Sequence, residues 1–164
     1  MATPTYTLID STTLTSSASS VTFSSITQDY RDLVLVVEWA GVSNGVVARV
    51  RINNDSGTNY SYVNAYGTGS GTSSFSATYS SIRTDIAGLD TSNKAQFKID
   101  FMDYSATDKH KTLLLRSNHT SGSRVGMVCQ RWANTSAITR LDIYEEFGTN
   151  LAAGSTFYLL GIEA

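Results

Sequence analysis

The segment Asp32-Leu33-Val34-Leu35-Val36-Val37-Glu38-Trp39 is a nearly continuous run of apolar, β-forming residues. A run of this length and composition is typical of a central strand that is covered on both faces of its sheet. A second segment, residues 94–102, alternates strictly, and one of its two sides carries Ala95, Phe97, Ile99 and Phe101. Alternation with a period of two is typical of a strand with one buried face. The two segments predict a β-sheet protein.

Further strand-like segments occur along the whole chain, at residues 6–9, 20–23, 46–52, 111–116, 127–132, 138–144 and 157–162. Asn44-Gly45 predicts a tight turn from which residues 46–52 return, and the Gly/Ser-rich residues 67–74 predict a surface loop. About ten short strands at regular spacing favour an all-β, antiparallel β-sandwich with a jelly-roll-like topology. We expect one β-sandwich domain over residues 1–164, in which residues 1–20 form an extended N-terminal arm or an edge strand.

The alternating residues of these segments predict the core. Twelve of them should be largely buried between the sheets: Leu33, Leu35, Val37, Val50, Ile52, Phe97, Ile99, Phe101, Leu141, Ile143, Phe157 and Leu159.

Composition excludes several classes of protein. The 164 residues carry a net charge of -2 and only 16% charged residues, with no basic stripe that could neutralise a nucleic-acid backbone, so we expect no nucleic-acid partner. The N-terminus resembles no secretory signal and no apolar run reaches membrane-spanning length, so we expect no membrane association. Serine and threonine make up roughly a quarter of the chain, which suits strands better than helices.

The candidate catalytic residues lack the partners that catalysis needs. His110 and His119 lie in polar surroundings without a nucleophile elbow or a spaced set of zinc ligands, so we interpret both as solvated histidines. Cys129, the only cysteine, lies within an expected strand and is interpreted as a buried structural thiol. Glu145 and Glu146 are adjacent in a strand, so they should face opposite sides.

One polar segment could bind a cation. Residues 53–57, Asn53-Asn54-Asp55-Ser56-Gly57, offer oxygen ligands, but their spacing does not match an EF-hand loop. An Asx turn explains the same residues better. We therefore expect no enzyme activity, no catalytic residue, no metal site and no cofactor.

Five tyrosines in or near polar segments are candidates for a contact surface, because tyrosine offers a large contact area at a low entropic cost. They are Tyr60, Tyr62, Tyr66, Tyr79 and Tyr104. Tyrosine also occupies strand positions in ordinary sandwiches, so both interpretations stay open.

Two segments resemble small virion structural proteins of tailed bacteriophages. Residues 51–62, from Arg51-Ile52-Asn53-Asn54-Asp55 to Tyr62, resemble a strand ending in Arg-x-Asn-Asn-Asp-x-Gly-x-Asn-Tyr. Residues 147–162, from Phe147 to Ile162, are similar to the closing pattern Ala-Ala-Gly-Ser-x-Phe-x-Leu-x-Gly-Ile of these proteins, and residues 138–144 are similar too. The resemblance spans most of the chain from about Ser24 onward, and it brings no functional residues with it.

This resemblance implies a protein of the virion, made in the host cytoplasm. We expect a capsid decoration (cement) protein that stabilises the head shell, whose partner is the major capsid protein or another virion protein. Symmetric self-association, with a trimer as the expected form, would cover exposed strand edges. The alternative is a tail-fibre or tail-tip module that binds a receptor or carbohydrate, in which case a host glycan is the partner.

Overall fold

The computed structural model describes residues 4–43, 46–89, 94–119 and 124–163, and the side chains of residues 46, 85–89 and 119 lie outside this described part. The described residues form twelve antiparallel strands and no helix, in two sheets. The protein is thus an antiparallel β-sandwich, which confirms the predicted fold class. Among the described residues there is accordingly no helix that is long and apolar enough to cross a membrane.

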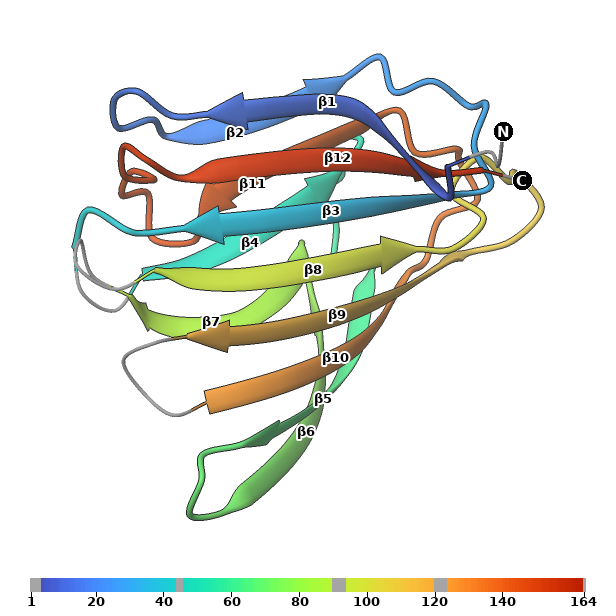
Figure 1. The fold of residues 1–164 in the computed structure, drawn as a ribbon. Coiled ribbons are helices and arrows are strands. Elements are labelled where there is room, and N and C mark those ends of the chain that lie inside the picture. Colours follow the sequence, from blue (N-terminus) through green and yellow to red (C-terminus); the bar gives the residue numbers. More distant parts are fainter. Residues whose placement is uncertain (1–3, 44–45, 90–93, 120–123, 164) are drawn as a thin grey trace.

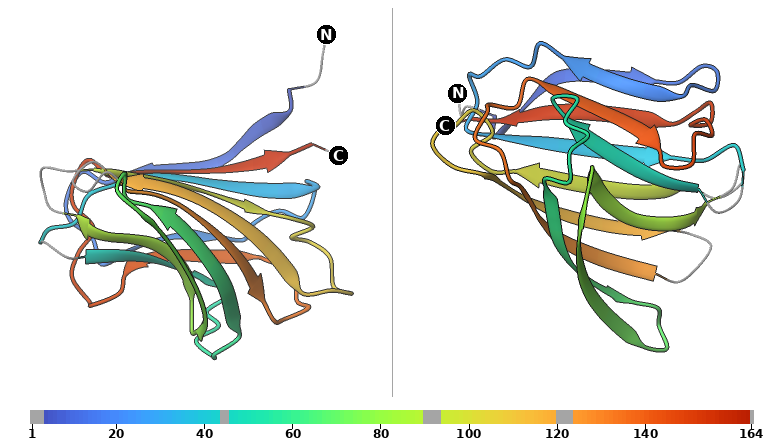
Figure 2. Two further views of the ribbon diagram at one scale, coloured as in Figure 1. Left: turned by 90° about the horizontal axis from the view of Figure 1, so that it is seen from below. Right: turned by 180° about the vertical axis from the view of Figure 1, so that it is seen from behind.

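The larger sheet has eight strands. In spatial order they are β1 (Tyr6–Thr13), β12 (Thr156–Ile162), β3 (Asp32–Trp39), β8 (Ala95–Phe101), β9 (Lys111–His119), β10 (Arg124–Trp132), β5 (Tyr60–Gly67) and β6 (Thr72–Tyr79). The smaller sheet lies behind it in Figure 1 and has the order β2 (Ser20–Ser24), β11 (Arg140–Glu145), β4 (Val46–Ile52) and β7 (Ile82–Leu89). The views from below and from behind show the same two layers and the strong twist of the larger sheet (Figure 2).

The chain changes sheets after each of its first four strands, so β1, β3 and β5 lie in the larger sheet and β2 and β4 in the smaller one. This connectivity corrects one prediction. Strands β3 and β4 do not form a hairpin, because β3 pairs with β12 and β8 whereas β4 pairs with β11 and β7. The predicted turn at Asn44-Gly45 lies outside the described residues.

Three strands differ from the sequence expectation. β5, β6 and β7 are absent from the strand-like segments that the sequence predicts, and the predicted loop of residues 67–74 overlaps β5 and β6. The predicted loop of residues 67–74 shrinks to a tight turn between Gly67 and Thr72, closed by a hydrogen bond from the Thr68 amide to the Gly71 carbonyl (2.9 Å). Gly69 has a φ of 83° in this turn, a conformation that glycine adopts without a steric penalty. Residues 6–13 form the edge strand β1, one of the two forms considered for the N-terminal segment.

The core lies between the inner faces of the two sheets. All twelve predicted core residues are buried and belong to one cluster, which confirms the assignment of the inward faces. Val34 points away from that cluster and is nevertheless fully buried. The central strand β3 is therefore covered on both faces at this position, as its apolar run predicts.

Candidate functional site

The five tyrosines do not form a contact surface. Tyr60, Tyr62 and Tyr104 are buried in the core, with exposed fractions of 1%, 4% and 0%, so the prediction is wrong for these three residues. Tyr66 and Tyr79 are partly exposed but each packs against an arginine. The Arg124 guanidinium lies 3.8 Å from the Tyr66 ring centroid, and that of Arg49 lies 5.0 Å from the Tyr79 ring centroid.

Buried tyrosines are tolerated because their hydroxyl groups find partners. The Tyr60 hydroxyl accepts a hydrogen bond from the Ile52 amide (3.1 Å) and lies 3.2 Å from the Asp55 carbonyl. The Tyr104 hydroxyl donates to the Thr27 carbonyl. Burial raises the pKa of both tyrosines above the ordinary value. These residues stabilise the sandwich and are not available to a ligand.

The polar segment of residues 53–57 has an architectural role. Asn53 and Asn54 have positive φ values of 50° and 58°, and the Asn53 side-chain carbonyl accepts hydrogen bonds from the Thr139 and Arg140 amides (both 3.0 Å). Asp55 accepts a hydrogen bond from the Gly57 amide (2.9 Å), which confirms the Asx turn.

Asp55 also anchors this turn to the core, because it accepts a hydrogen bond from the buried Trp132 indole (2.7 Å). Burial acts to raise the pKa of Asp55, but hydrogen bonds from Asn59, Trp132 and Gly57 and the charge of Arg51 outweigh it and lower the pKa below its ordinary value. The ionised carboxylate is therefore engaged by groups of the protein itself.

The closing segment is also architectural. Gly154 has a φ of 82° at the turn before β12. Ser155 is fully buried, and its hydroxyl donates to the Ala152 carbonyl (2.8 Å) and accepts from the Ala40 amide (3.2 Å). Residues 53–57 and 152–155 therefore build turns and core.

The histidines and the glutamate pair do not form a common site in the described part of the chain. His110 is exposed immediately before β9, and the side chain of His119 lies outside the described residues. Glu145 is buried and accepts hydrogen bonds from the Phe147 and Thr149 amides (2.8 and 2.9 Å), whereas Glu146 pairs with Arg49. In the described part of the chain, no group of three or more His, Cys, Asp or Glu residues could hold a metal ion.

The interpretation of Cys129 as a buried thiol is wrong, because its side chain is exposed. In β10 the side chains of Val128, Gln130 and Trp132 point into the sandwich, so Cys129 between them points outward. It lies beside Leu114 on β9.

The structure buries a lysine, Lys111, that no sequence pattern singles out. Lys111 is fully buried at the start of β9, and its Nζ donates to the carbonyl groups of Ala106, Lys109 and Thr135. Burial lowers the pKa of this lysine. Because its ammonium group is occupied by three backbone carbonyls, Lys111 holds the loop before β9 in place.

The face of the larger sheet that points away from the smaller sheet, here called the outer face, has no covering layer in the described residues. Antiparallel sheets with one solvated face usually carry polar residues there. Here, of the eleven large apolar side chains that are exposed in the described part of the chain, seven lie on the outer face. They are Tyr6, Leu8, Val63, Leu114, Val125, Met127 and Tyr158.

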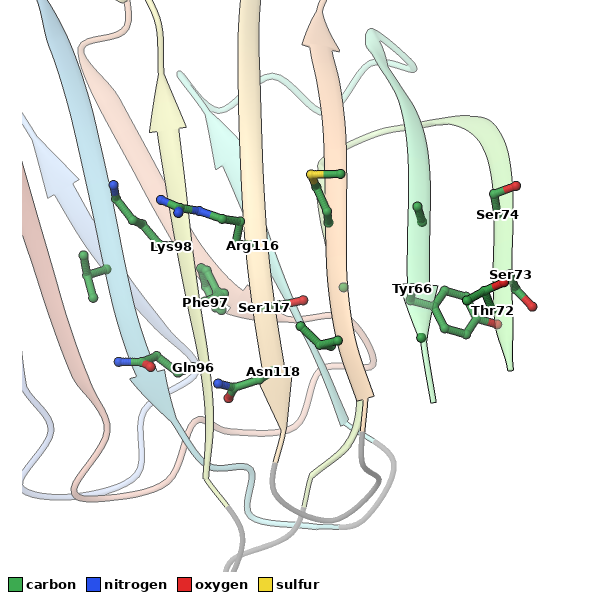
Figure 3. Close-up of a pocket in the computed structure, with 16 residues that line it drawn as sticks. Tyr66, Thr72, Ser73, Ser74, Gln96, Phe97, Lys98, Arg116, Ser117 and Asn118 are labelled. Carbon is green, nitrogen blue, oxygen red and sulfur yellow. The ribbon is translucent and has the colours of Figure 1, made fainter. Parts of the chain in front are cut away.

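A groove of about 960 Å³, here called the outer groove, crosses this face from β3 to β6. Figure 3 shows Gln96 and Lys98 of β8 beside Arg116 and Asn118 of β9, with the β5–β6 hairpin on the opposite side. The apolar side chains that line the outer groove include Val36, Ala65, Val125 and Met127, and the hydroxyl groups that point to the outer face are those of Thr72 and Ser74.

The two cations that line the outer groove, Lys98 and Arg116, share one carboxylate that lies outside the lining. Asp100 lies 2.8 Å from the Lys98 ammonium and 3.4 Å from the Arg116 guanidinium. One carboxylate thus faces two cations, and Arg116 is 58% exposed, so part of its hydrogen-bonding capacity is open to a ligand. The described lining residues include no carboxylate, imidazole or thiol. This lining suits binding better than proton transfer.

The chain matches no protein-family model, and no curated protein matches it in sequence. Solved structures that resemble it include a galectin from Caenorhabditis elegans (5% identity, 100% of this chain and 99% of that chain covered, TM-score 0.36). A PL-14 alginate lyase from Aplysia kurodai is 10% identical, with 83% and 72% of the two chains covered and a TM-score of 0.36. A second alginate lyase is 9% identical, with 94% and 81% covered and a TM-score of 0.33. At these identities the likeness concerns the β-sandwich fold alone.

Proposed function

We propose that this protein is a non-enzymatic structural protein of a tailed-bacteriophage particle, a capsid decoration protein that docks on the head shell through the outer face of its larger sheet. The observation that carries the docking surface is the gathering of seven exposed, large apolar side chains on this face. They form two groups, Tyr6, Leu8 and Tyr158 on β1 and β12 and the other four on β9, β10 and β5, with the polar outer-face residues of β8 between them. Exposed apolar groups of this kind mark interaction sites on soluble proteins. The particle and the partner, the major capsid protein or another virion protein, come from the sequence resemblance.

The geometry suits repeated docking. Leu114, Cys129 and Val63 are neighbours on three adjacent strands, so the apolar surface continues across β9, β10 and β5. A sheet whose backbone hydrogen bonds are already satisfied offers a firm surface that needs no ordering when a partner binds. A protein that binds only the intact shell stabilises it by mass action. When its free concentration is about 100 times its dissociation constant, the stabilisation is roughly 2.7 kcal/mol per site.

The first test compares particles with and without the protein. Particles from a deletion mutant should assemble and adsorb to host cells but lose infectivity at a lower temperature, and purified protein added back should restore heat resistance. Normal heat resistance together with lost adsorption would overturn the proposal.

The second test addresses the docking surface. The double variant Val125→Asp/Met127→Asp places two carboxylates on the outer face and should fail to restore heat resistance. Phe147→Asp is the matched control, because Phe147 is 68% exposed and lies in the turn after β11, away from this face. Equal restoration by both variants would exclude the outer face as the docking surface.

The outer groove favours a second candidate, a tail-fibre or tail-tip module that binds a carbohydrate receptor. The exposed amides of Gln96 and Asn118, the hydroxyl groups and the partly free Arg116 are groups that hydrogen-bond to a polyhydroxylated ligand. Under this alternative, Arg116→Ala should abolish adsorption to host cells and leave heat resistance unchanged. Densitometry of purified virions separates the two candidates, because decoration requires hundreds of copies and a tail tip about a dozen or fewer.

A further inference from the structure

The four edge strands of the sandwich are protected unequally. An edge strand exposes unpaired backbone N–H and C=O groups that can pair with another chain, and proteins block such pairing with bulges, charges, proline or very short strands. β1 has a register shift between Leu8 and Asp10 and carries the charge of Asp10. β2 has only five residues, and β7 pairs irregularly with β4 and carries Arg83.

The edge strand β6 has none of these protections. Its eight residues, Thr72-Ser73-Ser74-Phe75-Ser76-Ala77-Thr78-Tyr79, include no charge and no proline. Its pairing with β5 is unbroken from Tyr60↔Tyr79 to Gly67↔Thr72. All but the last of its residues are exposed, so the described residues place no cover over this edge.

We propose that β6 pairs antiparallel with β6 of a second copy of this chain, around a two-fold axis, and joins two larger sheets into one continuous sheet. The residues of β6 are self-complementary when Phe75 lies opposite Phe75 of the partner. On the outer face this register sets Ser74 opposite Ser76 and Thr72 opposite Thr78, so hydroxyl groups meet hydroxyl groups. On the inner face the Phe75 rings meet each other.

Each of these pairs is of a favourable kind. Aromatic pairs and Ser/Thr pairs stabilise neighbouring antiparallel strands, and like charges opposite each other destabilise them. Because β6 carries no charge, the paired strands set no like charges opposite each other, and Phe75, now 39% exposed, gains a cover. A three-fold ring closed by strand pairing would instead have to join β6 to a different edge, such as β1 with its bulge and Asp10.

The pairing also has a consequence for the outer groove. Residues opposite each other in this register lie on the same face of their sheets, so the two outer faces continue into one another. Thr72, Ser73 and Ser74 belong both to β6 and to the outer groove. The two grooves therefore meet at the seam between the copies.

The test is the mass of the full chain in solution, measured by light scattering over a concentration series. We expect a dimer of the 17.7 kDa chain that dissociates on dilution. The double variant Ser74→Lys/Ser76→Lys sets lysines opposite lysines and should be monomeric over the same series. The control Gln96→Lys/Thr112→Lys adds the same charge to exposed positions of the outer face. These positions lie on β8 and β9 in the middle of the larger sheet, so the control should remain dimeric.

A second measurement tests the register without adding charge. In a Cys129→Ser background, Phe75→Cys should oxidise to a covalent dimer, whereas Ser73→Cys, which faces Ala77 of the partner, should not. A monomer at every concentration, a trimer, or a dimer that the lysine pair at positions 74 and 76 leaves unchanged would overturn the proposal. None of these masses depends on the particle role, so this test and that of the docking surface succeed or fail separately.

Discussion

The ring of Tyr30 lies directly against Gly161 in β12. A Cβ atom added to Gly161 would overlap with the Cγ, Cδ1 and Cδ2 atoms of Tyr30, so only glycine fits at this position of the strand. Tyr30 in turn packs on the core cluster, and its amide donates to the Tyr104 hydroxyl (3.4 Å). The glycine near the end of the chain thus makes room for the segment that leads into β3.

Replacing this glycine should destabilise the protein. In Gly161→Ala the added methyl group must displace the Tyr30 ring, and we expect a loss of about 1–3 kcal/mol in the free energy of unfolding. Gly71→Ala is the control, because a Cβ there meets nothing within 4 Å. Urea denaturation of both variants measures the difference, and equal stability would show that Tyr30 moves aside without cost.

Truncation in the core should cost more. Phe101 is fully buried at the end of β8, and Phe101→Ala removes most of its side chain from the core cluster. We expect a loss of about 3–5 kcal/mol in the free energy of unfolding. Met102→Ala next to it, 57% exposed, should change stability by less than about 0.5 kcal/mol. A loss below about 1 kcal/mol for Phe101→Ala would mean that the inward face of β8 is misassigned.

Stability should fall in acid through Asp55. Because the folded pKa of Asp55 is lower than its unfolded value, the folded state favours the ionised carboxylate. Its contribution is complete above the unfolded pKa, near 3.8, and is lost as the pH falls through the folded pKa. Asp55→Asn should therefore lower stability at pH 7 and reduce the pH dependence below about pH 4. Thermal unfolding between pH 2 and 7 measures both effects, with the 78%-exposed Asp108→Asn as the control.

The single thiol should react in the folded protein. Cys129 is exposed on the outer face, so a maleimide should label it without denaturant, and mass spectrometry should show complete modification. Cys129→Ser should leave the melting temperature nearly unchanged, because no core contact is lost. Labelling that required denaturant would place the thiol inside the sandwich.

The strands that the sequence predicts well are those whose burial alternates or is complete. β8 and β12 alternate because they border the core on one side, whereas β3 is a nearly continuous apolar run in which the outward Val34 is as fully buried as the inward Leu33 and Leu35. β6 shows neither pattern, since nearly all of its residues are exposed, and its serines and threonines resemble a loop. The sequence indicates that the tyrosines of β5 lie in or near polar loops, because Ser61 and Asn64 interrupt the apolar pattern, although Asn64 is itself buried.

The outer groove could not be predicted in the same way. Lys98, Arg116 and Met127 come together only because β8, β9 and β10 are neighbours in one register. Alternation identifies each of these residues as facing away from the core. It does not say which strands are adjacent, so the groove is a property of the topology.

The position of β12 determines when the protein can finish folding. This strand, red in Figure 1, lies between β1 and β3, and Thr156 has Thr13 on one side and Glu38 on the other. During synthesis β1 and β3 leave the ribosome well before β12, the strand that pairs with both of them. Contacts between segments so distant in sequence form slowly, and unpaired strands are prone to aggregate in the interval. A nascent chain stalled before Thr156 would therefore hold a larger sheet that is divided between β1 and β3.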